Sequence, residues 1–164
     1  TDNGQDCEVC VAANDNAPGQ VVISGSRAAV ERAVKIAAER GAKRSVMLPV
    51  SGPFHCPLMA PVAEVMAEAL GNVEIKAPKL PLVSNVTASA VADPSAIRDL
   101  LVRQVTGLVR WRESMLYLRQ HGIGEIMEVG TGKVLSGLAK RIDRGLTGAS
   151  LGTPSEIEAL LAAR

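Results

Sequence analysis

Residues 125–142, "EIMEVGTGKVLSGLAKRI", decide the fold class. The first five of these residues are typical of a strand, Gly130-Thr131-Gly132 of a turn, and 133–142 of a helix. A strand that passes through a short turn into a helix is the repeating unit of α/β layered domains. We therefore predict an α/β domain with a largely parallel sheet.

The rest of the chain continues the same alternation in both directions. The first fifty residues differ, because two strands precede one helix and a further strand follows, which is most of a β-β-α-β unit. The final helix opens at the capping box Thr153-Pro154-Ser155-Glu156. The predicted strands are 8–13, 20–24, 45–50, 81–85 and 149–151, and the predicted helices are 27–40, 57–70, 94–105 and 110–121.

Composition limits the class of protein. With 164 residues, 47% of them hydrophobic and 21% charged, the chain is about one globular domain long. A net charge of +1 without a basic, aromatic-rich cluster argues against nucleic acid, and no apolar run is long enough to span a membrane. Three cysteines do not suggest a disulfide framework, so we expect a reducing cytoplasm. The chain starts without Met and enters a strand almost at once, which favours a fragment.

Three short motifs match functional patterns only in part. Residues 148–152 fit G-x-S-x-G, yet the capping box starts the helix three residues too late for a nucleophile elbow, so Ser150 is expected to be structural. Cys7 and Cys10 have zinc-ligand spacing but lack a second paired knuckle, so we predict no metal site. Residues 130–133 lack the Walker pattern, although such a turn could still hold an anion or a carbonyl.

His55 has a more suggestive setting, in "VSGPFHCPLM" at residues 50–59. Pro53 restricts the backbone before it, and Pro57 suits the first turn of the helix that follows. A histidine held on a stiff corner is suited to general base catalysis. An ordinary loop histidine remains the alternative on these residues alone.

Three segments together resemble a known family. They are "NAPGQVVISG" at 16–25, "VSGPFHCPLM" at 50–59 and "EVGTGKVLSGLAKRI" at 128–142. In this order and approximate spacing they are similar to the C-terminal half of malonyl-CoA:acyl carrier protein transacylase. The resemblance extends over about residues 9–161.

The resemblance implies a fold and an activity. The family combines an α/β-hydrolase-like large subdomain with an inserted ferredoxin-like small subdomain, so residues 1–50 are expected to be part of the small one and 51–164 the closing part of the large one. The implied activity is acyl-carrier-protein S-malonyltransferase of fatty acid biosynthesis. A serine takes malonyl from coenzyme A as an ester and passes it to the phosphopantetheine thiol of acyl carrier protein, without a bound cofactor.

The resemblance also implies catalytic residues. His55 matches the family's histidine, which deprotonates the serine and then the incoming thiol. Gln104, in "VRQVTG", matches the position whose carbonyl oxygen accepts a hydrogen bond from that histidine ring. A neutral carbonyl there replaces the carboxylate of a hydrolase triad.

Five further residues are expected to contact substrate by the same resemblance. Phe54 would lie beside the acyl group, and Asn14 and Asn16 border the acyl cleft. Lys43 and Arg44 match a basic pair near its mouth, suited to coenzyme A phosphates or the acidic carrier. For the basic pair a solvated surface position is an equally good interpretation.

One departure from the family pattern is large. The sequence contains no G-H-S-x-G, so the family's nucleophile is absent and the piece alone is expected to be inactive. Two alternatives therefore stay open beside the fatty acid enzyme. The chain could come from the acyltransferase domain of a polyketide synthase, or be a non-catalytic fragment that binds the carrier protein.

Overall fold

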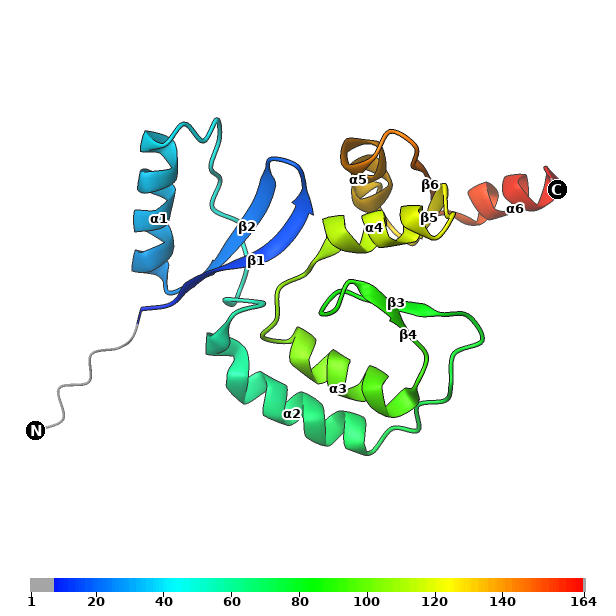
Figure 1. Cartoon of the computed structure of the whole chain (residues 1–164), viewed down its shortest axis with the longest axis horizontal. Coiled ribbons are helices and arrows are strands. Elements are labelled where there is room, and N and C mark those ends of the chain that lie inside the picture. The colour runs from blue at the N-terminus through cyan, green and yellow to red at the C-terminus, as the bar shows by residue number, and fades with distance from the viewer. Residues whose placement is uncertain (1–7, 164) are drawn as a thin grey trace, which may run out of the picture.

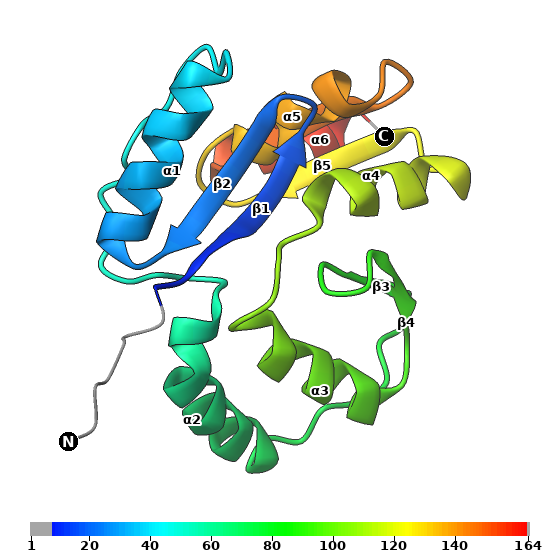
Figure 2. The same ribbon diagram turned by 60° about the vertical axis from the view of Figure 1, so that its left-hand side comes forward.

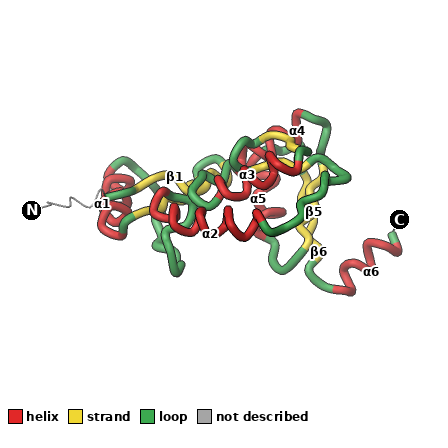
Figure 3. The backbone as a smooth tube through the Cα atoms, turned by 90° about the horizontal axis from the view of Figure 1, so that it is seen from below, coloured by secondary structure: helices red, strands yellow, loops and turns green. Residues whose placement is uncertain are grey.

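The computed structural model describes residues 8–163. Helices and strands are interspersed along the chain, and α1 and α6 lie toward opposite ends of an elongated molecule (Figures 1 and 3). The elements are β1 (Cys10–Ala17), β2 (Gln20–Gly25), α1 (Arg27–Glu39), η1 (Pro57–Met59), α2 (Ala60–Gly71), β3 (Leu82–Ser84), β4 (Ser89–Val91), α3 (Pro94–Gln104), α4 (Trp111–Gln120), β5 (Glu125–Val129), α5 (Val134–Ile142), β6 (Thr147–Leu151) and α6 (Pro154–Ala162).

The strands of residues 8–163 form three separate pairs. Of these, β1 with β2 and β3 with β4 are antiparallel, and β5 with β6 is parallel. The predicted strand–turn–helix at 125–142 is confirmed as β5, the glycine turn and α5. The predicted largely parallel sheet is wrong for the described residues, and β4 was not predicted. Local sequence indicates which residues are extended, whereas pairing depends on which strands meet.

The predicted strand at 45–50 is also wrong. Residues 44–50 have no regular secondary structure, and no strand of the described residues pairs with them. A strand is defined by the hydrogen bonds that it exchanges with a neighbour, so apolar and β-branched composition alone cannot form one.

Helix ends follow the capping signals. The Asp93 carboxylate accepts the Ala96 main-chain N–H at 2.8 Å where α3 begins, with Pro94 at its first position. The capping box between Thr153 and Glu156 is present at the start of α6. α2 begins three residues later than predicted, because Pro57–Met59 form a 3₁₀ turn.

A small core joins α4 to α5. Met115, Ala139 and Leu146 are buried together, and Trp111 is among the half-buried side chains packed around them. No helix of the described residues combines the length and the apolar character that a membrane crossing requires.

β1 is attached to the segment between α3 and α4. The Asp15 N–H donates to the Val109 carbonyl at 2.9 Å, and the Val109 N–H donates to the Ala13 carbonyl at 2.8 Å. The Arg112 guanidinium also holds both oxygens of the Asp15 carboxylate, at 2.7–3.0 Å. Figure 2 shows the resulting arrangement, with the β1–β2 hairpin beside α4 and α5. β1 is therefore fixed to the part of the chain that follows Gln104.

Candidate active site

His55 lies at a sharp corner before η1. Its φ angle is 58°, in the left-handed region that non-glycine residues seldom adopt. The next residue, Cys56, is fully buried, and its thiol donates to the Pro53 carbonyl at 3.0 Å. The corner is thus anchored by Cys56, and His55 beside it is half-buried. Backbone outliers of this kind concentrate at functional sites.

The structure brings His55 and Gln104 together. The His55 Nδ1 atom lies 2.9 Å from the main-chain carbonyl oxygen of Gln104. Because a carbonyl oxygen can only accept, Nδ1 must carry the proton of this bond. In the neutral ring Nε2 is then unprotonated and available to accept a proton.

Gln104 is itself held by a tight turn. It is the last residue of α3, where main-chain carbonyls have no partner within the helix. Its side-chain amide donates to the Gly107 carbonyl at 2.9 Å. A Cβ atom at Gly107 would lie 2.8 Å from the Arg103 carbonyl oxygen, so the turn closes only around glycine. This turn orients the Gln104 carbonyl toward the His55 imidazole.

Phe54 directly precedes the histidine, and its side chain is 45% exposed. Its ring lies against Gly52, where a Cβ would be 3.7 Å from the ring. Phe54 is therefore adjacent to His55 in sequence, and its phenyl group is not packed into the core of the described residues.

The structure does not bring the other four predicted binding residues into contact with His55 as it does Gln104. Asn14 and Asn16 lie half-buried on β1, and Asn14 forms an isolated parallel bridge with Val109, five residues after Gln104. Lys43 and Arg44 are exposed beyond the end of α1 and form no ion pair with another described residue. No hydrogen bond or ion pair among residues 8–163 connects these four with His55.

The glycine turn at 130–132 does not present a free anion site. The Glu128 carboxylate accepts the Ser136 main-chain N–H and hydroxyl, each at 2.9 Å, at the start of α5. These donors hold the pKa of Glu128 below its usual range. The chain's own carboxylate takes the place that an external anion would need. Glu128 is eight positions before Ser136, and no local sequence pattern indicates this contact.

Ser150 lies within β6, paired with Glu128 of β5, and α6 begins only at Pro154. It is therefore not at a strand-to-helix elbow. Among residues 8–163 no group of three or more potential metal-ligating side chains occurs. Cys10 is exposed on β1, and Cys7 lies outside the described residues.

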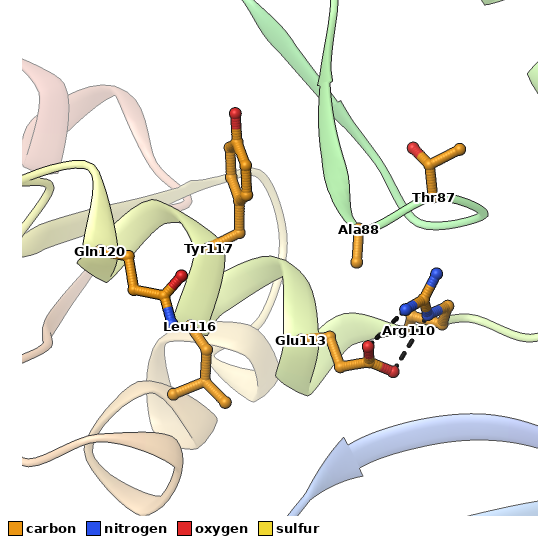
Figure 4. Close-up of a pocket in the computed structure, with 7 residues that line it drawn as sticks. All are labelled: Thr87, Ala88, Arg110, Glu113, Leu116, Tyr117 and Gln120. Atoms are coloured by element: carbon orange, nitrogen blue, oxygen red, sulfur yellow. Dashed lines mark hydrogen bonds and ion pairs between the residues drawn. The ribbon is translucent and has the colours of Figure 1, made fainter.

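The surface of residues 8–163 includes two hollows of interest. The larger, about 290 Å³, lies between α4 and the β3–β4 turn and contains none of the predicted site residues (Figure 4). It contains an ion pair that the sequence did not reveal, in which Arg110 holds the pKa of Glu113 below its usual range. The smaller, about 150 Å³, lies between β3 and α3 and is bordered by Gln104.

Comparison with solved structures defines the class of fold. Acyl-carrier-protein-S-malonyltransferase from Bartonella henselae superposes with a TM-score of 0.89 at 50% identity, over 94% of this chain and 49% of that one. A malonyl-transacylase solved in complex with its type II PKS acyl carrier protein gives 0.91 at 39% identity, over 97% and 52%. The chain therefore has an α/β acyltransferase fold.

The sequence comparison is more specific. The malonyl CoA-acyl carrier protein transacylase of Escherichia coli K12 is 46% identical over 154 residues, which are 94% of this chain and 50% of the relative. No family model matches the chain. The chain is a homologue of the malonyl CoA-acyl carrier protein transacylases and spans about half of their length, which fits a C-terminal portion. The resemblance inferred from the three motifs is confirmed.

Proposed function

We propose that this chain supplies the general base of an acyl-carrier-protein S-malonyltransferase of fatty acid biosynthesis. The observation that carries the proposal is the 2.9 Å contact between His55 Nδ1 and the Gln104 carbonyl. This contact leaves Nε2 as the proton acceptor, and it holds the half-buried imidazole at a corner of positive φ. The homology to malonyl CoA-acyl carrier protein transacylases supplies the substrate class.

The proposed chemistry has two half-reactions. In the first, His55 Nε2 accepts the proton of a serine hydroxyl while the serine oxygen bonds to the malonyl thioester carbon; the C–S bond then breaks and the coenzyme A sulfur takes the proton. In the second, Nε2 accepts the proton of the phosphopantetheine thiol, whose sulfur bonds to the malonyl carbon as the serine oxygen leaves with that proton. The serine belongs to the half of the transacylase length that this chain does not match.

Gln104 acts in this scheme through its main chain. Its carbonyl fixes the imidazole orientation and tautomer without adding a negative charge beside the ring. The hydrogen bond from the Gln104 side-chain amide to the Gly107 carbonyl holds the Gln104 carbonyl in place.

The remaining predicted residues are assigned to substrate. We propose that Phe54 forms a wall of the acyl cleft beside the base, with Asn14 and Asn16 on another border. Lys43 and Arg44, both exposed, are suited to coenzyme A phosphates or to the acidic carrier.

The finer architecture and setting belong to the same proposal. Residues 1–50 are assigned to a ferredoxin-like small subdomain and 51–164 to the large α/β-hydrolase-like subdomain. The substrates are malonyl-CoA and phosphopantetheinylated acyl carrier protein, with no bound cofactor, in the cytoplasm.

A second candidate is malonyl transfer to a polyketide carrier protein. The solved complex with a type II PKS acyl carrier protein, at 39% identity and a TM-score of 0.91, favours it as the alternative. The chemistry at His55 would be the same, and only the carrier protein would differ.

The test joins this chain to the unmatched half of the E. coli relative and measures malonyl transfer from malonyl-CoA to carrier protein by intact mass. We expect transfer by the joined protein, and none by this chain alone. A fatty acid carrier and a type II polyketide carrier, compared at equal concentration, separate the two candidates. A folded joined protein that loads neither carrier would leave a non-catalytic, carrier-binding role and overturn the proposal.

A further inference from the structure

The pairing of β1 with β2 is interrupted around Asn14, Asp15 and Asn16. The register shifts once at Ala13 and again at Asn16, and neither of these two residues faces a residue of β2. Each shift is a β-bulge, and bulges redirect side chains and are over-represented beside active sites. Pairing with β2 therefore fixes this part of β1 less firmly than an uninterrupted ladder would.

The opposite side of β1 supplies a second attachment. The Asp15 N–H donates to the Val109 carbonyl at 2.9 Å, and the Val109 N–H donates to the Ala13 carbonyl at 2.8 Å. Arg112, near the start of α4, holds the Asp15 carboxylate: its Nε lies 3.0 and 2.9 Å from the two oxygens, and its Nη2 lies 2.7 Å from one of them. A contact through two guanidinium nitrogens fixes orientation as well as distance.

The ion pair between Asp15 and Arg112 is partly removed from water. The Asp15 side chain is 18% exposed and the Arg112 side chain 37%. The neighbouring carboxylate of Glu113 is already paired with Arg110, so each arginine has its own carboxylate. Exposed ion pairs usually contribute little, but good two-nitrogen geometry is the recognised exception. The pair is therefore a defined link between β1 and α4.

Asp15 lies between the two asparagines that the proposed function assigns to the acyl cleft. Neighbouring residues of a strand are about 3.3 Å apart and are joined by planar peptide bonds. A rotation or shift of Asp15 therefore moves both Asn14 and Asn16. Whatever fixes the Asp15 carboxylate also fixes the two asparagine side chains.

We propose that Arg112 is a positioning residue for substrate binding, which holds Asn14 and Asn16 through the Asp15 carboxylate in the geometry that receives the acyl group of malonyl-CoA. The role of the two asparagines rests on the proposed function. Arg112 itself touches neither the substrate nor the reacting atoms in this scheme.

The general base is held by different contacts. The His55 ring is bound to the Gln104 carbonyl, and the Gln104 side chain is bound to Gly107. Neither contact includes Asp15 or Arg112. Loss of the ion pair should therefore weaken substrate binding and leave the chemical step nearly unchanged.

The test is Arg112→Ala in the joined protein, assayed as steady-state malonyl transfer at a temperature where thermal unfolding shows the variant to be folded. KM for malonyl-CoA should rise about two- to twelvefold, the contribution of one neutral hydrogen bond, while kcat stays within about twofold. Arg112→Lys keeps the charge but not the two-nitrogen contact, so it should recover only part of the loss. A folded Arg112→Ala protein with an unchanged KM overturns the proposal.

Asp15→Asn separates action through Asp15 from direct contact between Arg112 and substrate. It should raise KM as Arg112→Ala does, and the double variant should be no worse than the more impaired single one, because both changes remove the same contact. If Arg112 bound a substrate phosphate itself, Asp15→Asn would free the guanidinium and leave KM unchanged or lower. That result would overturn the proposal.

Arg119→Ala is the matched control on the same helix. Its side chain is 44% exposed, and its ion-pair contact is with Asp143 at 3.9 Å, away from β1. It should leave both KM and kcat near the parent values. A rise in KM equal to that of Arg112→Ala would contradict the assignment of the effect to β1.

Amide exchange tests the attachment of β1 without turnover. In Arg112→Ala the Asp15 and Val109 N–H groups should exchange about fivefold faster, the contribution of a well-formed, partly exposed ion pair, and in Arg119→Ala at the parent rate. Unchanged exchange in Arg112→Ala overturns the proposal even if KM rises. A parent protein that transfers no malonyl but shows the faster exchange in Arg112→Ala would overturn the proposed function and leave the attachment of β1 by Arg112 standing.

Discussion

Gly107→Ala should impair catalysis although residue 107 touches neither substrate nor the imidazole. The added Cβ would lie 2.8 Å from the Arg103 carbonyl oxygen and 3.9 Å from the Gln104 Cα. To reach a C···O contact of about 3.3 Å, the two segments must separate by about 0.5 Å. If Gln104 moves by that amount, its 2.9 Å contact with His55 Nδ1 lengthens to about 3.4 Å, beyond the hydrogen-bond range.

The size of the rate loss follows from the positive charge that the His55 imidazole acquires when it accepts a proton. Losing a hydrogen bond to a charged group costs about 1.5–3 kcal/mol. We therefore expect kcat of the joined enzyme to fall about 10- to 150-fold, with a smaller change in KM for malonyl-CoA, because the bond acts on the base and not on substrate binding. The assay is steady-state malonyl transfer to carrier protein, with thermal unfolding measured in parallel.

Gly71→Ala is the matched control, since a Cβ at the end of α2 would meet no atom within 4 Å. It should leave kcat within about twofold of the parent, as surface substitutions away from special features usually do. A Gly107→Ala enzyme with unchanged kcat would refute the reasoning. So would an equal loss in both variants.

Three further predictions concern separate parts of the chain. Phe54→Ser in the joined enzyme should raise the methylmalonyl-to-malonyl ratio of kcat/KM about tenfold or more, because one methyl group in a pocket is worth about 1–3 kcal/mol. The ratio is measured by competitive loading and mass spectrometry, and a fall of both rates together, with an unchanged ratio, would contradict the prediction. This chain alone, incubated with malonyl-CoA, should show no covalent malonyl on intact mass, and an adduct mapped to Ser150 would reverse the structural interpretation of that serine. Glu128→Gln should lower the urea midpoint at neutral pH. Because the folded pKa of Glu128 is depressed, the parent's advantage should shrink progressively as pH falls below the unfolded value of about 4.3, and an advantage that stays constant over that acid range would argue against the Ser136 contact.

The parts of the fold that sequence predicted are those specified by neighbouring residues. The Asp93 cap of α3, the Thr153 capping box of α6 and the glycine turn before α5 all depend on contacts within a few positions, and all are present. The proximity of His55 and Gln104 was expected only through family resemblance, because they are 49 positions apart and joined by a main-chain atom that has no sequence signature.

The parts that sequence missed depend on distant partners. Segment 45–50 looks like a strand but has no neighbour among the described residues. β4 is three residues long, and its partner in the described part of the chain is β3. The Arg112–Asp15 pair connects residues 97 positions apart, and no local pattern indicates it. Composition predicts extended conformation, whereas pairing requires knowledge of the opposite strand.

The most direct test of the central claim is His55→Ala in the joined enzyme, measured as single-turnover malonyl transfer to carrier protein. Removing a general base should lower the rate about 10²- to 10⁴-fold. The fold should persist, because Cys56 and not His55 fills the buried position at the corner. His121→Ala is the control: its ring caps the end of α4 at the Tyr117 carbonyl and stacks on Tyr117, and its loss should leave transfer near the parent rate. Near-normal transfer by a folded His55→Ala enzyme would contradict the assignment of His55 as the base.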